Sequence, residues 1–184
     1  MTDYYGGSRA RLITTSLYNF INNGINDLGW YDTDRKHLPV TFTPKSFDAL
    51  NGKLTEDLKP NLISFSDEDD TDSIEIELGN VAAEVSWDFY IDIFAESSSV
   101  GVDLSCDIRD ILMGRHDPNR VTEQGPRVPI YDYNMATPVP LFHCDIENVG
   151  RGRVKGRGRV KGSAANEPWK KFWYVVHFEI VDSY

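Results

Sequence analysis

The sequence has few of the residues that build disulfide frameworks, metal sites or membrane spans. Only two of its 184 residues are cysteines, Cys106 and Cys144, and only four are histidines. Two cysteines are too few for a disulfide framework, so we expect free thiols in a cytosolic product. No stretch approaches the roughly 18 uninterrupted apolar residues of a membrane span, and no apolar segment follows Met1. We therefore expect no membrane association and no secretory signal.

The motifs of common metal and cofactor sites are missing too. The sequence has no Cys-x-x-Cys and no His-Glu-x-x-His, and the neighbours His143 and Cys144 would point to opposite faces of a strand. The acidic run 67–72 shares only its charge with a calcium loop. Asp72 stands where such a loop needs glycine, and Leu78 where it needs glutamate. We predict no metal and no cofactor.

One pair of residues suggests nucleophilic catalysis. Cys144 would need a histidine close to it in space, and His177 is a conceivable neighbour. A small apolar cysteine on the buried face of a strand explains Cys144 equally well. Because no other catalytic pattern accompanies this pair, we predict that the protein is not an enzyme and has no catalytic residues.

Charge is distributed unevenly along the chain. The formal net charge is −10, and because the acid-free segment 151–162 contributes +6, the remainder carries −16. This basic segment repeats Arg-Gly-Arg-Val-Lys-Gly in tandem, and its charged residues are Arg151, Arg153, Lys155, Arg157, Arg159 and Lys161. Three interpretations stay open: a solvated loop, a contact with an acidic surface of a neighbouring subunit, or a contact with nucleic-acid phosphates. The acidic remainder disfavours general DNA binding.

Two segments have the periodicity of amphipathic helices. The first runs from about Ser8 to a stop at Gly29, and its apolar stripe consists of Ile13, Leu17, Ile21, Ile25 and Leu28. The second runs from about Ser98 to a stop at Gly114, and its stripe consists of Val100, Leu104, Ile108, Ile111 and Leu112. Each helix has a single apolar face, so we expect both to cover the same sheet.

Alternating and apolar runs predict the strands. We expect them at 61–65, 74–78, 84–94, 141–149 and 169–181, with at most a short strand near 40–42. The strand 84–94 places odd-numbered apolar residues on one face and leaves the even-numbered face wet or in an interface. Residues 115–140 hold five prolines and show no period, so we predict a proline-rich loop there and a basic hairpin loop at 150–168.

These elements predict one domain over residues 1–184. The order is helix, three strands, helix and two strands, which favours an α+β fold. We expect a mixed, mostly antiparallel β-sheet covered by two α-helices, with a long β-hairpin extension.

The arrangement resembles the tail terminator proteins of long, flexible-tailed bacteriophages, particularly those of actinobacterial hosts. The similarity covers roughly Ser8 to Val181. It is carried by the order of elements and by the segments Ile74–Glu77, Trp87–Glu96, Asp107–Leu112 and Trp173–Ile180. The duplicated basic segment departs from the pattern.

The resemblance implies a single tail-terminator-like domain that acts as a structural virion protein. Such proteins form a hexameric ring at the head-proximal end of the tail tube, end its polymerisation, and offer a docking surface to head-completion or neck proteins. The implied partners are sister copies, the tail-tube protein and a neck protein. If the basic hairpin faces the lumen it would also meet genomic DNA, and if it faces outward it would brace the neck.

A ring requires a head-to-tail interface made of different patches. We expect the even-numbered face of strand 84–94 and the loop 115–140 to supply one such interface, with Asp88, Tyr90, Asp92, Arg127, Tyr131 and Tyr133 as candidate contacts. The alternatives are another head–tail connector or tail-tube protein, a small hydrolase that uses Cys144, and a free DNA-binding protein.

Overall fold

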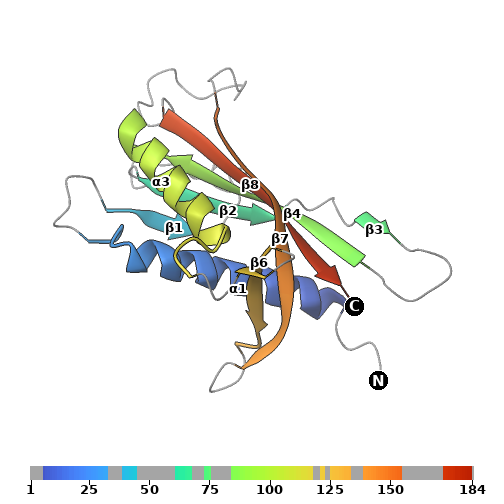
Figure 1. The fold of residues 1–184 in the computed structure, drawn as a ribbon. Coiled ribbons are helices and arrows are strands. Elements are labelled where there is room, and N and C mark those ends of the chain that lie inside the picture. The colour runs from blue at the N-terminus through green and yellow to red at the C-terminus, as the bar shows by residue number, and fades with distance from the viewer. Residues whose placement is uncertain are drawn as a thin grey trace.

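The computed structural model describes residues 6–32, 39–44, 61–67, 73–75, 84–117, 121–122, 125–133, 139–154 and 172–183. Within these ranges the protein has the expected α+β fold, with two helices on one face of a mostly antiparallel sheet (Figure 1). Four predicted parts lie outside the described residues: 68–72 of the acidic turn, 76–78 of the predicted strand 74–78, 155–168 of the predicted basic hairpin loop, and 169–171 at the start of the last predicted strand.

Helix α1 spans Gly6–Asp27 and buries four of the five residues of the predicted apolar stripe, whereas the fifth, Leu28, follows the helix and is half-buried. Ile13, Leu17, Ile21 and Ile25 are each 0% exposed. Gly29 has a φ of 72°, a left-handed conformation that favours glycine, and it ends the helix as predicted. The chain after the helix end is held to the second helix, because the Trp30 Nε1–H donates to Asp107 Oδ2 at 2.8 Å.

Helix α3 spans Ser98–Leu112 and packs across α1 and the sheet. The Ser97 side chain caps its first turn by accepting from the Val100 backbone N–H at 3.3 Å. Gly114, with a φ of 68°, follows its end. The two helices approach so closely that a Cβ atom at Gly24 would lie 2.8 Å from the Ile111 side chain. The predicted boundaries of both helices are confirmed within two residues.

The described strands form one sheet with the order β1-β2-β4-β8-β7-β6-β5, and β3 pairs with β4. Only β1 and β2 pair in parallel; the other neighbours are antiparallel. The strands are β1 Thr41–Thr43, β2 Leu62–Asp67, β3 Ser73–Glu75, β4 Glu84–Phe94, β5 Val121–Thr122, β6 Gly125–Tyr131, β7 Pro140–Arg153 and β8 Trp173–Ser183.

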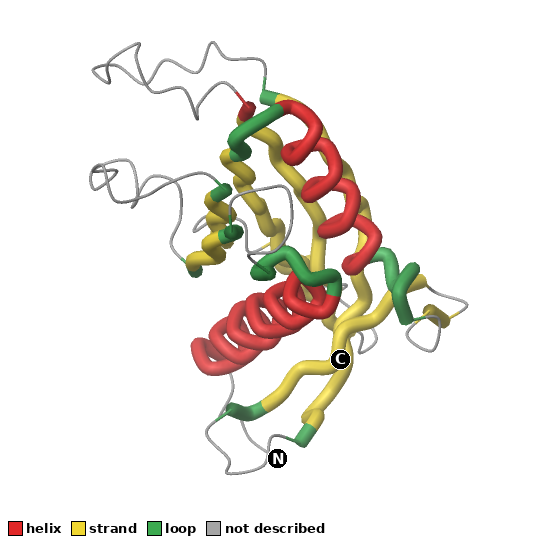
Figure 2. Tube along the Cα trace, turned by 90° about the vertical axis from the view of Figure 1, so that its left-hand side faces the viewer, coloured by secondary structure: helices red, strands yellow, loops and turns green. Residues whose placement is uncertain are grey.

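The core lies between the helices and the face of the sheet that they cover, here called the inner face. Phe65, Phe89 and Phe178 stack across β2, β4 and β8 with centroids 5.5 Å apart at each step. All three rings are buried. The opposite face of the sheet, here called the outer face, carries the even-numbered side chains of β4, such as Asp88 and Tyr90. Residues of both helices belong to the same buried cluster as the three phenylalanine rings, and Figure 2 shows one end of each helix close to the other.

Strand β7 contains a bulge that reverses its side-chain alternation. Asn148 has a φ of 50°, and the register with β8 shifts between Glu147 and Gly150. Glu147 precedes the shift, alternates with the buried Ile146 and points to the outer face. Arg151 and Arg153 follow the shift, lie opposite inner-face residues of β8, and therefore point to the helix side. Below the bulge, β7 pairs with β6 and the sheet curls around α1 (Figure 1).

The prediction of an irregular loop over 115–140 is wrong in its central part. Strand β6 occupies Gly125–Tyr131 and pairs with β7, and the short β5 pairs with β6. Alternate residues of β6 are buried: Pro126, Val128 and Ile130. Proline usually interrupts a strand, but Pro126 is a buried apolar residue of the inner face. Near the sheet edge, where β5 is only two residues long, few ladder N–H groups are needed.

An ion pair fastens the start of α1 to the end of β8. Both guanidinium Nε–H and Nη2–H of Arg9 donate to the Asp182 carboxylate, the latter at 2.6 Å. Asp182 is 1% exposed, and Arg9 also lies over the Phe142 ring at 3.9 Å from its centroid. This bidentate pair, whose carboxylate is buried, joins the start of α1 to the end of β8.

Candidate subunit interface and basic hairpin

The candidate residues on β4 lie on the outer face and form a small polar and aromatic cluster with β8. Asp88 Oδ1 lies 3.0 Å from His177 Nε2, and the ring of Tyr90 lies 4.7 Å from that of His177. Asp88 and His177 side chains are 33% and 35% exposed, so this cluster is accessible to a partner.

Asp92 lies on the same face but is largely withdrawn from solvent. It is 8% exposed and accepts a hydrogen bond from Trp173 Nε1–H at 2.7 Å. Leu62, Ser64 and Phe94, which also belong to the outer face, are buried as well. Among the described residues, the outer face is therefore more accessible around Asp88 and His177 than around Asp92.

The candidates on β6 and just after it lie in another part of the molecule. Arg127 Nε–H donates to Asp145 Oδ1 at 2.6 Å, and this bond raises the pKa of the Arg127 guanidinium. Tyr131 and Tyr133 have ring centroids 5.9 Å apart, and Tyr133 is 39% exposed. The Tyr131 backbone is bound to Ser16 of α1. Because β7 and β8 separate β6 from β4, these residues do not form one patch with Asp88.

The described part of the basic segment borders a cavity beside α3. Arg151 and Arg153 are exposed, and with the backbone of Gly152 they form one wall of a cavity of about 380 Å³. The opposite wall consists of Ser98, Val102, Ser105 and Tyr174. Arg151 Nη1–H donates to Ser105 Oγ at 3.4 Å, and the Arg153 guanidinium lies 6.0 Å from the Tyr174 ring centroid. Lys155, Arg157, Arg159 and Lys161 lie outside the described residues.

Sequence reasoning missed a row of carboxylates that crosses three strands. Glu147 of β7 is directly opposite Glu179 of β8, which is directly opposite Asp88 of β4. Asn148 Nδ2–H donates to Glu179 Oε2 at 2.6 Å, and His177 contacts Asp88. Alternation in the sequence indicates the outward direction of Asp88, but only the strand order and the register of β7 with β8 bring the three acids together.

Cys144 and His177 do not form a catalytic pair. Cys144 is 0% exposed and belongs to the inner-face core with Val176 and Phe178, whereas His177 points to the outer face. Burial raises the pKa of the Cys144 thiol, with the nearby Asp182 carboxylate adding to the effect. Across the described part of the chain, no group of three or more His, Cys, Asp or Glu side chains is placed to hold a metal ion.

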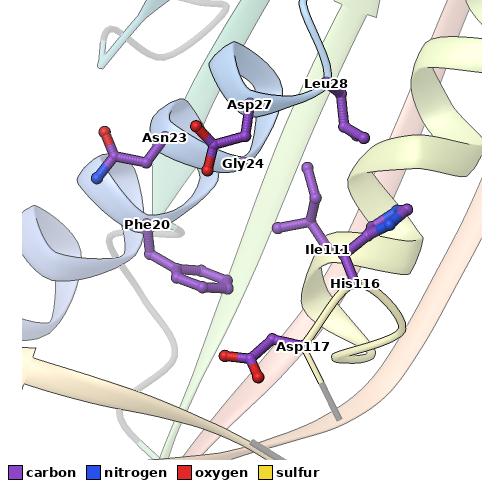
Figure 3. A pocket seen from close by; sticks show the side chains of 8 residues that line it. All are labelled: Phe20, Asn23, Gly24, Asp27, Leu28, Ile111, His116 and Asp117. Atoms are coloured by element: carbon purple, nitrogen blue, oxygen red, sulfur yellow. The ribbon is translucent and has the colours of Figure 1, made fainter. Parts of the chain in front are cut away.

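A second cavity, of about 220 Å³, lies between the end of α1 and the turn that follows α3 (Figure 3). Phe20 and Ile111 supply its apolar wall, and Asp27, His116 and Asp117 stand at its rim. No pattern in the sequence indicates this cavity, because it arises where the two helices cross closely at Gly24.

Neither described helix is long and apolar enough to cross a membrane. No protein-family model matches the chain, and no curated protein is significantly similar to it.

Proposed function

We propose that this chain is a structural virion protein that forms a ring at the head-proximal end of the tail tube of a long-tailed bacteriophage. In that position it ends tube polymerisation and offers the docking surface for the neck. The proposal is based on the resemblance to tail terminator proteins in the order of elements and in the segments of β4, α3 and β8. The proposed partners are sister copies, the tail-tube protein and a neck protein.

The observation that carries the proposal is the one-sided helix cover of the sheet. Both helices pack on the inner face, while Asp88, Tyr90, His177 and Glu179 on the outer face of β4 and β8 remain accessible. Polar, aromatic and partly exposed surfaces of this kind are suited to subunit contacts, where Tyr side chains are enriched. A ring subunit requires such a surface in addition to a second, different patch.

The alternative of a Cys144 hydrolase loses its geometric basis, because Cys144 and His177 lie on opposite faces of the sheet. Another head–tail connector or a tail-tube protein remains as the second candidate, since neck and tail-tube proteins share parts of this order of elements. The three virion roles differ in what happens to the tail when the protein is missing.

The test is therefore the tail length of particles assembled without this chain. An amber mutation in the gene should produce tails of uncontrolled length that are not joined to heads, as measured by negative-stain electron microscopy. Normal-length tails separated from heads would favour a connector, and the complete absence of tails would favour a tube protein. Normal, infectious particles would refute every virion role. Suppression of the amber codon provides the matched control.

A further inference from the structure

The cavity beside α3 has the chemistry of an anion-binding surface. Its described lining combines the guanidinium groups of Arg151 and Arg153 with the hydroxyl groups of Ser98, Ser105 and Tyr174, and it includes no carboxylate. Among the described residues Arg151 contacts only a serine hydroxyl. Guanidinium groups bind carboxylates through paired N–H donors, so this surface is complementary to acidic side chains.

The row Asp88, Glu179 and Glu147 has the opposite chemistry. Acids directly opposite each other on neighbouring strands repel, which destabilises the isolated sheet. The subunit relieves this repulsion only in part. His177 contacts Asp88 and Asn148 donates to Glu179, whereas Glu147 is exposed and forms no ion pair within the described ranges. A cationic partner would remove the remaining repulsion.

The two surfaces cannot meet within one subunit. After the bulge at Asn148, Arg151 and Arg153 point to the inner side of the sheet, whereas the acidic row lies on the outer face. A pairing between them therefore joins different patches of two copies, which is the head-to-tail arrangement that generates rings or filaments. The net charge of −16 outside segment 151–162 favours a second copy over a nucleic acid as the source of the anion.

We propose that Arg151 and Arg153 of one subunit dock on the acidic row Asp88, Glu179 and Glu147 of a second copy. This inference rests on the proposed ring-forming function and identifies the two patches that make the subunit contact. It gives the basic hairpin a protein partner, namely the next subunit.

The experiment uses two neutral variants of the full chain. Arg151→Gln/Arg153→Gln removes the cationic patch. Glu147→Gln/Glu179→Gln neutralises two of the three acids of the row and leaves Asp88, which His177 already contacts, while the amide oxygen at position 179 still accepts from Asn148. Native mass spectrometry should show rings for the wild type and monomers for each variant, with association weakened roughly a hundredfold. An equimolar mixture of the two variants should form heterodimers that grow no further, because one intact patch on each chain meets its complement. This heterodimer also shows that both variants are folded.

Arg11→Gln, which removes an exposed cation on α1, serves as the matched control and should assemble normally.

Other outcomes overturn the pairing. Variants that assemble like the wild type would place the interface elsewhere, and so would a mixture that remains monomeric. A wild-type chain that stays monomeric at every concentration would also refute the pairing, whereas the amber phenotype would still decide the tail function. If Arg151→Gln/Arg153→Gln abolishes salt-sensitive DNA retention and leaves assembly intact, the anion is nucleic acid and the proposed partner is wrong.

Discussion

Removing the central charge of the acidic row should stabilise the isolated subunit. Glu179 is directly opposite two other acids, Glu147 and Asp88, and it is partly exposed. A like-charge cross-strand pair costs about 0.2–1 kcal/mol, so two such pairs cost about 0.4–2 kcal/mol before screening by salt. Glu179→Gln keeps the acceptor for Asn148 and removes both repulsions. For a domain of this size, about 1 kcal/mol raises Tm by about 2–4 °C.

The measurement is thermal unfolding followed by circular dichroism, at a concentration where native mass spectrometry shows separate subunits. Glu179→Gln should melt above the wild type at low ionic strength, and the difference should shrink in 1 M NaCl, where the screening length is about 3 Å. Asp103→Asn, which makes the same change in net charge at an exposed position on α3, should shift Tm little. A lower Tm for Glu179→Gln, or a gain that salt leaves unchanged, would refute the argument that these acids repel one another.

Three further predictions concern the interior. Arg9→Ala leaves the buried Asp182 carboxylate without its partner and should lower the free energy of unfolding by about 3–5 kcal/mol in urea titrations. A variant as stable as the wild type would contradict this role of Arg9. The native protein should react with Ellman's reagent at the half-buried Cys106. Cys144 should react only after unfolding, because burial raises the pKa of its thiol. Rapid labelling of two thiols in the native protein would contradict this prediction. Burial raises the pKa of Tyr31 to about 12, so its contribution to stability is complete below pH 10 and is lost as the pH rises through 12. Phenolate absorbance should therefore include one component near pH 12 that disappears in Tyr31→Phe.

The helices and the central strands could be predicted because burial imposes a regular period on their residues. Ile13, Leu17, Ile21 and Ile25 repeat every four residues and are all fully buried. Gly29 follows that helix with a φ of 72°, as the sequence indicates. In these segments local preference and tertiary packing agree, so the hydrophobic pattern alone is sufficient to predict the element.

Strand β6 could not be predicted because its alternation is partly made of proline. Pro126 takes a buried position that an aliphatic residue would normally occupy, and a proline at a sheet edge needs no ladder N–H. The acidic row could not be predicted either, because its three members come from strands that are far apart in the sequence. Its assembly depends on the strand order β4-β8-β7 and on the register of these strands, which no local periodicity in the sequence indicates.

The most direct test of the account is a cryo-electron microscopy reconstruction of the head–tail junction of the particle. We predict a single ring of this chain between the neck and the first ring of the tail tube, with Arg151 and Arg153 of each subunit against the outer face of its neighbour. The absence of the chain from the junction, or its repetition along the whole tube, would contradict the proposed function.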